Sequence, residues 1–152
     1  MPESPEIAAL AKTVSDGLDR DEEAARALAR PRRGEPVPRW VATPGGAGID
    51  DTEGVPRVKF AWARERKHIL RHDPHRVLAD VAARRTLLDE ALGWKHRVTE
   101  DRHYVCLVAT VEHDGGASSD RDDSSTCDCG RDVHVRAVLT ALAAPYQTME
   151  SS

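Results

Sequence analysis

The chain has 152 residues, of which 39% are hydrophobic, 4% aromatic and 32% charged, and its formal net charge is −4. A chain of this length can bury one hydrophobic core, so we expect a single domain over residues 1–152. The negative charge argues against a protein that binds nucleic acid by its overall charge, although local basic segments remain. The N-terminus lacks the pattern of a secretory signal and no uncharged apolar stretch could span a bilayer. We therefore predict a cytoplasmic protein with no membrane partner.

The first segment, Ser4–Ala29, predicts a long amphipathic helix. Its apolar residues recur three or four positions apart, which places them on one face. They are Ile7, Leu10, Ala11, Val14, Leu18, Ala25 and Leu28. Ser4 followed by proline is a typical helix start, and Pro31 ends the segment. The opposite face is acidic, which is typical of a surface exposed to solvent.

Two later segments, Arg39–Thr43 and Arg57–Trp62, have the composition of β-strands. The second carries apolar residues at every other position. A glycine-rich stretch separates the two segments, so we expect an antiparallel hairpin joined by a flexible loop at about residues 44–55. The glycines lack the register and the Lys-Ser/Thr ending of a phosphate-binding loop, so a nucleotide site is not predicted.

The best-defined helix is expected to begin at Pro74 and to end near Gly93. Asp73 precedes the proline, and its carboxylate can accept a hydrogen bond from an unpaired backbone N–H of the first turn. Val77, Val81, Leu88 and Leu92 form its apolar face. A shorter helix, over about residues 61–71, ends just before this start.

His68 and His72 lie one helical turn apart, a spacing that helical zinc ligands use. A metalloprotease motif needs a glutamate directly after the first histidine, and Ile69 occupies that position. We therefore interpret both as surface histidines.

The C-terminal third combines an apolar run, a polar stretch and a helix. His103–Glu112 is short and apolar and fits either a strand or a buried helical turn. Residues 113–126 are rich in Gly, Ser and Asp, which predicts a second flexible loop. A last helix is expected to follow Asp132, as its N-cap, and to end at Pro145. Its apolar stripe consists of Val135, Val138, Leu139 and Leu142.

These segments predict a mainly α (α+β) fold, with three helices packed together and one small antiparallel β-hairpin.

Placing residues about 100° apart around each helix puts Arg84 and Arg85 inside the apolar face of the central helix and Asp21 inside that of the first helix. We therefore expect the two helices to pack antiparallel or nearly so. Asp21, with Glu22 beside it, is then expected to meet Arg84 or Arg85. The alternatives are arginines that extend into solvent or that bind an anionic ligand.

The cysteines are three in number, and two of them are one residue apart, so a disulfide framework is not expected. Cys106, Cys127 and Cys129 together with one histidine would complete a tetrahedral zinc site. We take His134 as that histidine, with His103 and His113 as the alternatives. The spacing differs from the usual Cys-x-x-Cys, and Cys106 fits a small buried hydrophobe equally well. Free thiols remain the alternative, and no cofactor is firmly implied.

Several of these motifs occur together in an uncharacterised family. They are Asp21–Ala27, Pro38–Trp40, His72–Leu78 with Arg84 and Arg85 following, and Leu142–Tyr146. In this combination the chain resembles the domain-of-unknown-function family 6221 of actinobacteria and their phages. The resemblance implies a small cytoplasmic protein and supplies no activity, substrate or catalytic residue. Members usually continue with an acidic, histidine-bearing tail, which Gln147–Ser152 replaces here. We take eight residues as structural or interaction residues: Asp21, His72, Asp73, Pro74, Arg84, Arg85, Pro145 and Tyr146.

The function that the sequence favours is a non-catalytic interaction module, with a protein partner preferred and nucleic acid as the second choice. The nucleic-acid choice depends on two basic clusters: Arg30, Arg32, Arg33 and Arg39, and Arg64, Arg66, Lys67 and Arg71. A zinc-stabilised module is the alternative from another class. An enzyme is the third choice, because no nucleophile, base and orienting residue lie within local reach. A helix start beside Cys129 would lower the pKa of its thiol, but the carboxylates of Asp128 and Asp132 oppose the formation of a thiolate. We therefore do not predict a catalytic cysteine.

Overall fold

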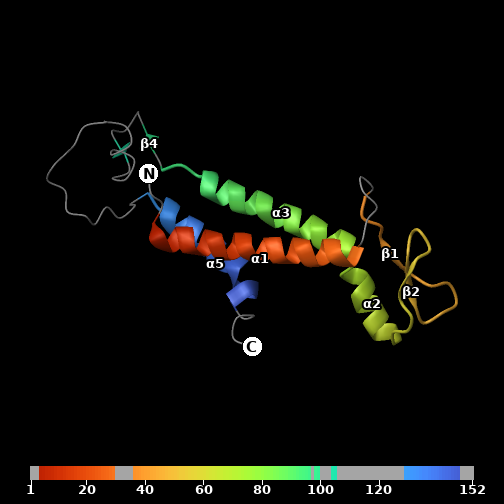
Figure 1. Cartoon of the computed structure of the whole chain (residues 1–152). Helices are drawn as coiled ribbons and strands as arrows, with labels where there is room; N and C mark the ends of the chain where they lie inside the picture. The colour runs from red at the N-terminus through yellow and green to blue at the C-terminus, as the bar shows by residue number, and fades with distance from the viewer. Residues whose placement is uncertain (1–3, 30–35, 97, 100–103, 106–128, 148–152) are drawn as a thin grey trace. The chain divides into compact units, whose positions relative to one another are not determined.

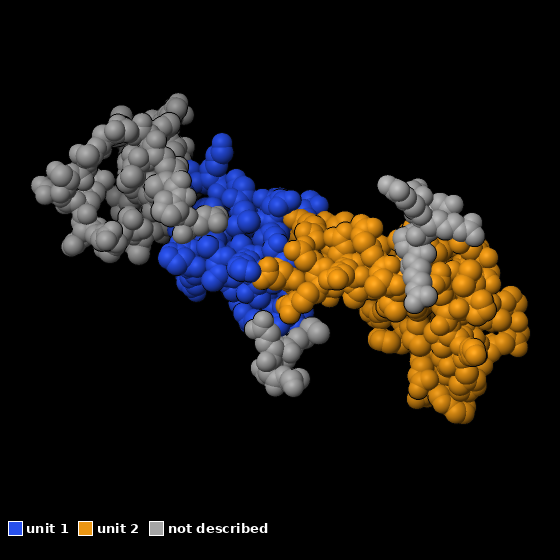
Figure 2. All heavy atoms as spheres, viewed as in Figure 1, with its two compact units in different colours: residues 1–15, 86–152 blue, residues 16–85 orange. Residues whose placement is uncertain are grey.

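The computed structural model describes residues 4–29, 36–96, 98–99, 104–105 and 129–147. These residues form four helices and five short strands (Figure 1), which confirms the mainly α fold with a small β element. Among these helices, none has both the length and the apolar character needed to cross a membrane. The chain divides into two compact units, which are described separately: unit 1 holds residues 1–15 and 86–152, and unit 2 holds residues 16–85 (Figure 2). The single domain expected from the chain length stays a prediction.

Helix α1 (Pro5–Ala29) forms where the apolar spacing predicts it. The Ser4 carbonyl accepts a hydrogen bond from the Ala8 N–H at 3.0 Å, so the helix begins directly after the serine. Three of its large apolar residues at helical spacing, Ile7, Val14 and Leu18, are fully buried, and Leu10 is half-buried. Leu28 differs from the prediction, because 59% of it is exposed.

Unit 1 is built from the first part of α1, the end of α3 (Pro74–Gly93) and α5 (Arg131–Gln147). Its buried side chains include Val135, Leu139 and Tyr146 of α5. Arg136 of α5 and Glu6 of α1 form an ion pair, with Nε and Oε2 3.0 Å apart.

Helix α5 corrects the prediction at both of its ends. It begins at Arg131, so the predicted N-cap Asp132 lies inside the first turn, and it continues through Pro145 to Gln147. A proline removes only one backbone hydrogen bond, and it lies here in the last turn, where little helix follows. Ala143 and Tyr146 are buried on either side of Pro145, so side-chain packing holds this turn in helical form.

Two short strands also belong to unit 1: β4 (Val98–Thr99) and β5 (Tyr104–Val105). They pair antiparallel, with Val98 opposite Val105. The two described residues of the segment 103–112 are therefore in a strand, one of the two forms that the sequence allowed. The loop predicted over residues 113–126 lies outside the described residues.

Unit 2 contains an antiparallel sheet in the order β1-β2-β3: β1 (Trp40–Ala42), β2 (Ile49–Asp51) and β3 (Pro56–Val58). The sequence predicted a two-stranded hairpin and assigned residues 44–55 to its loop. That loop holds the central strand. Ile49 and Asp51 are buried while Asp50 between them is half-buried, which is the alternation of a strand. Aspartate disfavours strands, so composition gave no sign of β2.

The second expected strand, Arg57–Trp62, is also shorter than predicted, because β3 ends at Val58. Helix α2 (Ala63–Arg71) follows, in agreement with the sequence. Its first turn is closed by the Glu65 carboxylate, which accepts a hydrogen bond from the Trp62 N–H at 3.1 Å.

Helix α3 begins at Pro74, as predicted, and Asp73 caps it. One oxygen of the Asp73 carboxylate accepts a hydrogen bond from the Arg76 N–H at 2.8 Å. The other oxygen accepts one from the Trp40 N–H of β1 at 3.1 Å. Since Asp73 is only 2% exposed, this carboxylate fixes the helix start to the edge of the sheet.

Candidate functional site

A cysteine, a histidine and an aspartate come together in unit 1 beside the start of α5. The Cys129 sulfur lies 3.6 Å from Nδ1 of His96. The other ring nitrogen of His96, Nε2, lies 3.9 Å from Oδ1 of Asp132. Gly130, with a φ of 82°, makes the turn from Cys129 into the helix. The three side chains therefore form a chain of thiol, imidazole and carboxylate.

Arg131 holds this arrangement in place. Its guanidinium donates hydrogen bonds to the carbonyl of Trp94 at 2.9 Å and to Oδ1 of Asp132 at 2.8 Å. A third bond goes to the carbonyl of Leu92 at 3.4 Å, near the end of α3. Because one planar side chain spans both segments, it fixes the residues just after α3 against the first turn of α5.

An open pocket of about 260 Å³ lies at this place, lined in part by Cys129, Arg131 and His134. The His134 ring is stacked on Trp94, with the ring centroids 4.4 Å apart. Of the predicted zinc ligands, Cys129 and His134 thus line one pocket, but His96 is the histidine that contacts the sulfur.

The other predicted ligands, Cys106 and Cys127, lie outside the described residues, as do the alternatives His103 and His113. Within the described residues there is no cluster of three or more His, Cys, Asp or Glu side chains that could hold a metal ion. His96 was missed in the sequence because 33 residues separate it from Cys129. No local spacing signals such a contact.

Unit 2 exposes two aromatic rings side by side, between β3 and α2. Phe60 is 57% and Trp62 is 69% exposed. Their ring centroids are 5.2 Å apart and the rings meet edge to face at 83°. Ala61 between them is buried and donates its N–H to the Ala47 carbonyl at 2.8 Å. Since neighbouring residues of an extended segment point to opposite sides, this anchor turns both rings toward solvent.

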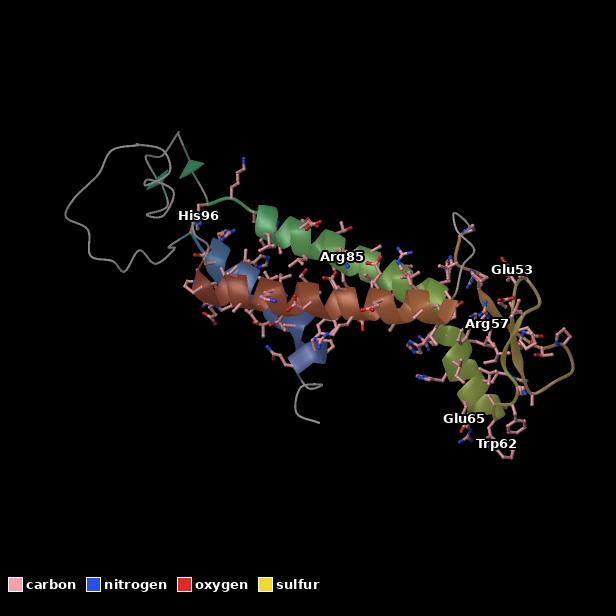
Figure 3. The ribbon with its side chains drawn as sticks, viewed as in Figure 1. Glu53, Arg57, Trp62, Glu65, Arg85 and His96 are labelled. Carbon is pink, nitrogen blue, oxygen red and sulfur yellow. The ribbon has the colours of Figure 1, made fainter. Side chains whose placement is uncertain are left out.

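The segment that carries these rings is also rich in cations. The segment from Pro56 to His72 contains six Arg or Lys residues and one Glu, which gives it a charge of +5 in a chain of net charge −4. Four of the six are exposed and form no ion pair among the described residues: Lys59, Arg64, Lys67 and Arg71. Arg57 is bound to Asp51, and Arg66 donates a hydrogen bond to the Gly46 carbonyl. We call the two rings and the four exposed cations the aromatic–basic surface; Figure 3 shows Trp62 at the start of α2.

Only part of the basic clusters named from the sequence is in this surface. Arg64, Lys67 and Arg71 belong to it, whereas Arg66 is engaged with the backbone. In the linker cluster Arg39 is exposed, and Arg30, Arg32 and Arg33 lie outside the described residues.

Two arginine–carboxylate clusters lie in unit 2; Figure 3 labels their arginines, Arg57 and Arg85. In the first, Asp51 is fully buried and accepts four hydrogen bonds. Two come from Arg57, at 2.9 and 2.6 Å, and two from the N–H groups of Glu53 and Val55, each at 2.9 Å. Arg57 also donates to the Ala29 carbonyl at 3.2 Å, at the end of α1. Burial by itself raises the pKa of Asp51, but the bonds from Val55, Arg57 and Glu53 outweigh it and hold this pKa below its ordinary value.

In the second cluster, Arg85 of α3 donates to Asp19 at 2.6 Å and to Glu22 at 2.9 Å. Both acids are on α1, and within unit 2 the two helices run in opposite directions (Figure 1). Glu22 is one of the acids named from the sequence; Asp19 was not, and Arg85 does not bond to Asp21. The hydrogen bond from Arg26 is the largest effect on the pKa of Glu22 and lowers it. Burial opposes this effect, and the hydrogen bond from Arg85 adds to it, so the pKa stays below its ordinary value.

The remaining residues singled out in the sequence have local structural positions. The His72 N–H ends α2 by donating to the His68 carbonyl at 3.1 Å, and the two exposed rings lie 4.6 Å apart. Pro145 and Tyr146 belong to the last turn of α5. Asp21 and Arg84 are half-buried on α1 and α3.

Comparisons with curated proteins and with solved structures find no match for this chain. One family model matches residues 8–148, which is nearly the whole sequence. The match includes nearly all of α1, the sheet, α3 and the whole of α5, and therefore both the Cys129–His96 contact and the aromatic–basic surface. The chain belongs to the family described as Family of unknown function (DUF6221).

Proposed function

We propose that the protein is a non-catalytic interaction module that binds single-stranded nucleic acid through the aromatic–basic surface. The observation that carries this proposal is the exposed pair of Phe60 and Trp62 in a segment that also has four exposed cations. Exposed rings stack on unpaired bases of any sequence, and the cations neutralise the phosphates beside them. Because the net charge of the whole chain is negative, binding has to depend on local basic segments such as this one.

A protein partner, preferred on the sequence alone, fits this surface less well. The buried centres of protein interfaces are depleted in lysine. Here Lys59 adjoins Phe60, and Lys67 is exposed on the helix that follows Trp62. A polyanion with aromatic bases matches both features of the surface at once.

The test is fluorescence anisotropy of a labelled single-stranded oligonucleotide, titrated with the full chain at several salt concentrations. With four phosphates neutralised, a plot of log affinity against log salt concentration should have a slope of about −3. Replacing Trp62 by Ala should weaken binding by about 5- to 150-fold, the usual contribution of one stacked base.

Matched control variants distinguish the loss of stacking or of charge from general damage to the fold. Val133→Ala removes a side chain that is 65% exposed on α5, and Arg20→Ala removes an exposed cation from α1. Both should bind as the wild type does, whereas Lys67→Ala should make the salt slope shallower by about 0.7. Absence of binding at low salt would contradict the proposal and return a protein partner to first place.

We propose as a second candidate that unit 1 is a zinc-stabilised module, because the described thiol, Cys129, lies against an imidazole nitrogen. Thiolate and imidazole are the ligands of structural zinc sites. A reducing cytoplasm, as predicted from the sequence, keeps cysteines out of disulfides and so available as metal ligands. The test is metal analysis of protein purified without added metal or chelator, which should find close to one zinc per chain.

A further inference from the structure

We propose that Cys129 is a reactive thiol activated by His96, and that a small hydroperoxide oxidises it to a sulfenic acid. This proposal goes beyond the nucleic-acid surface of unit 2, because it assigns a modification site to unit 1. It is also an alternative to the zinc-stabilised module, since a thiolate bound to zinc is no longer available to react. The site uses described residues alone: Cys129, His96, Asp132 and Arg131.

The first support is the contact between the thiol and the imidazole. The Cys129 sulfur lies 3.6 Å from Nδ1 of His96, within the range of a hydrogen bond that involves sulfur. An imidazole at this distance can take the proton of the thiol, and the resulting positive ring stabilises the thiolate beside it. The thiolate is the form of cysteine that reacts as a nucleophile. His96 is therefore placed to act as the base for this thiol.

The second support is the carboxylate at the other ring nitrogen. Oδ1 of Asp132 lies 3.9 Å from Nε2 of His96, so it favours a positive charge on the ring. On the sequence alone, Asp132 was expected to oppose a thiolate. In the structure the guanidinium of Arg131 donates to the same oxygen at 2.8 Å, and its positive charge offsets that of the carboxylate. Asp132 therefore supports the charged imidazole, while Arg131 limits its repulsion of the thiolate.

The third support is access to the sulfur. Cys129 is half-buried and lines the open pocket of about 260 Å³. Arg131 lines the same pocket and is anchored to the Trp94 carbonyl at 2.9 Å. Cysteines that respond to oxidants combine thiolate character with access to solvent. A hydroperoxide is small enough to reach the sulfur through this pocket.

Oxidation would consume one hydrogen peroxide and release one water. His96 takes the proton of Cys129, which gives a thiolate and an imidazolium. The sulfur attacks one peroxide oxygen, so an S–O bond forms while the O–O bond breaks and its electron pair leaves with hydroxide. The imidazolium returns its proton to this hydroxide, which becomes water. The sulfur is oxidised to the sulfenic acid, the peroxide is reduced, and His96 is neutral again.

The experiment measures the rate of this oxidation with hydrogen peroxide in the reduced, full-length chain, and traps the sulfenic acid with a dimedone-type probe. Cys106→Ser together with Cys127→Ser leaves Cys129 as the sole thiol of the chain, so mass spectrometry reports on it alone. At pH 7 it should react about 3- to 10-fold faster than glutathione, because a larger thiolate fraction outweighs the weaker nucleophilicity of a more acidic thiol.

Single substitutions in this background assign the roles. His96→Ala should slow the oxidation to the rate of glutathione, and Asp132→Asn should slow it in part. His75→Ala removes an exposed histidine from α3 and should react as its parent does. Circular dichroism identifies any variant that fails to fold.

A second variant keeps the test decisive if His96→Ala does not fold. His96→Asn retains a polar group near the position of Nδ1, but the amide cannot take a proton. The pH at which the rate reaches half of its maximum should then lie about one pH unit higher than with His96 in place. A histidine with a merely structural role would leave this midpoint unchanged, which would contradict the proposal.

Other outcomes would also overturn the assignment. One is oxidation at the rate of glutathione in folded protein that contains His96. Another is a slower reaction in His134→Ala with an unchanged rate in His96→Ala, since a different histidine would then be the base. Close to one zinc per wild-type chain, lost in Cys129→Ser, would reject the reactive thiol in favour of the zinc-stabilised module. None of these results affects the nucleic-acid surface of unit 2.

Discussion

The two arginine–carboxylate clusters of unit 2 have the same chemistry and different surroundings. The side chain of Asp51 is 0% exposed and that of its partner Arg57 is 14% exposed. In the other cluster, Arg85 is 37% exposed, and Asp19 and Glu22 are 62% and 31% exposed. Both arginines engage their acids at hydrogen-bond distance, so the distances alone do not distinguish the clusters.

Burial decides what each cluster does. When a buried ion pair loses one partner, the other charge stays unpaired in a place that water does not reach, and the loss is large. When an exposed pair is broken, water replaces the partner and salt already screens the attraction. Asp51 should therefore determine whether the sheet forms at all, whereas Arg85 should fix the register of α3 on α1 with little effect on stability.

The largest effect is expected for Asp51→Asn. The amide keeps the size of the carboxylate but removes the charge opposite Arg57 and places N–H groups where donors already point. We expect a loss of about 3–5 kcal/mol in the free energy of unfolding, measured with urea. Asp50→Asn is the matched control, since Asp50 is the half-buried neighbour on the same strand. Equal effects of the two variants would contradict the role given to the Asp51 cluster.

The stability of the fold should depend on pH in part through the Asp51 carboxylate. The folded-state pKa values of Asp51 and Glu22 are lowered, so each group contributes stability above its unfolded pKa of about 4 and loses this contribution as the pH falls through its folded pKa. Urea unfolding should therefore show lower stability at about pH 3 than at about pH 6. Asp51→Asn should flatten this dependence. A slope that is unchanged in the variant would show that other groups cause it.

A smaller loss of stability is expected for Gly48→Ala, at the residue just before β2. A Cβ on Gly48 would lie 2.9 Å from the Thr43 hydroxyl and 2.9 Å from the backbone carbonyl of Val58. Because the carbonyl belongs to the neighbouring strand, Gly48→Ala has to push the strands apart, at a cost of about 2 kcal/mol. Gly93→Ala, where a Cβ meets nothing within 4 Å, is the control and should not destabilise.

Asp73 is a buried carboxylate that is satisfied by two backbone N–H groups and no arginine. Asp73→Ala should cost about 1 kcal/mol in urea unfolding, the usual loss for a helix N-cap. Asp80→Ala, on the exposed side of the same helix, should cost less. A loss as large as that of Asp51→Asn would mean that the bond to Trp40 contributes much more than the cap.

The smallest loss in the free energy of unfolding is expected for Arg85→Ala, and this loss should become smaller still in high salt. A double-mutant cycle with Asp19→Asn and Glu22→Gln should detect coupling to both acids, since both lie within hydrogen-bond distance of Arg85. Additive effects within experimental error would show that the contacts do not contribute to stability. Arg85→Lys keeps the charge but loses the planar pair of donors, so it should recover only part of the coupling.

The sequence by itself determined the helices. The spacing of Ile7, Val14 and Leu18, the proline after Asp73, and the stripe of Val135 and Leu139 all depend on residues within a few positions of one another. Caps and amphipathic faces are local properties of this kind, so they can be recognised without knowing what they pack against. Tertiary packing nevertheless moved the predicted end of α5, because buried Tyr146 keeps this helix going beyond Pro145.

Only the tertiary structure decided the features that join distant residues. Strand β2 has an unfavourable composition, and it exists because Asp51 meets Arg57 and because Gly48 lets the strands approach closely. The Phe60 and Trp62 rings looked like a strand's apolar face but are exposed, because Ala61 anchors the chain between them. His96 and Cys129 meet across 33 residues through the bonds of Arg131. Such contacts leave no periodic pattern in the sequence, because only the folded backbone brings these atoms together.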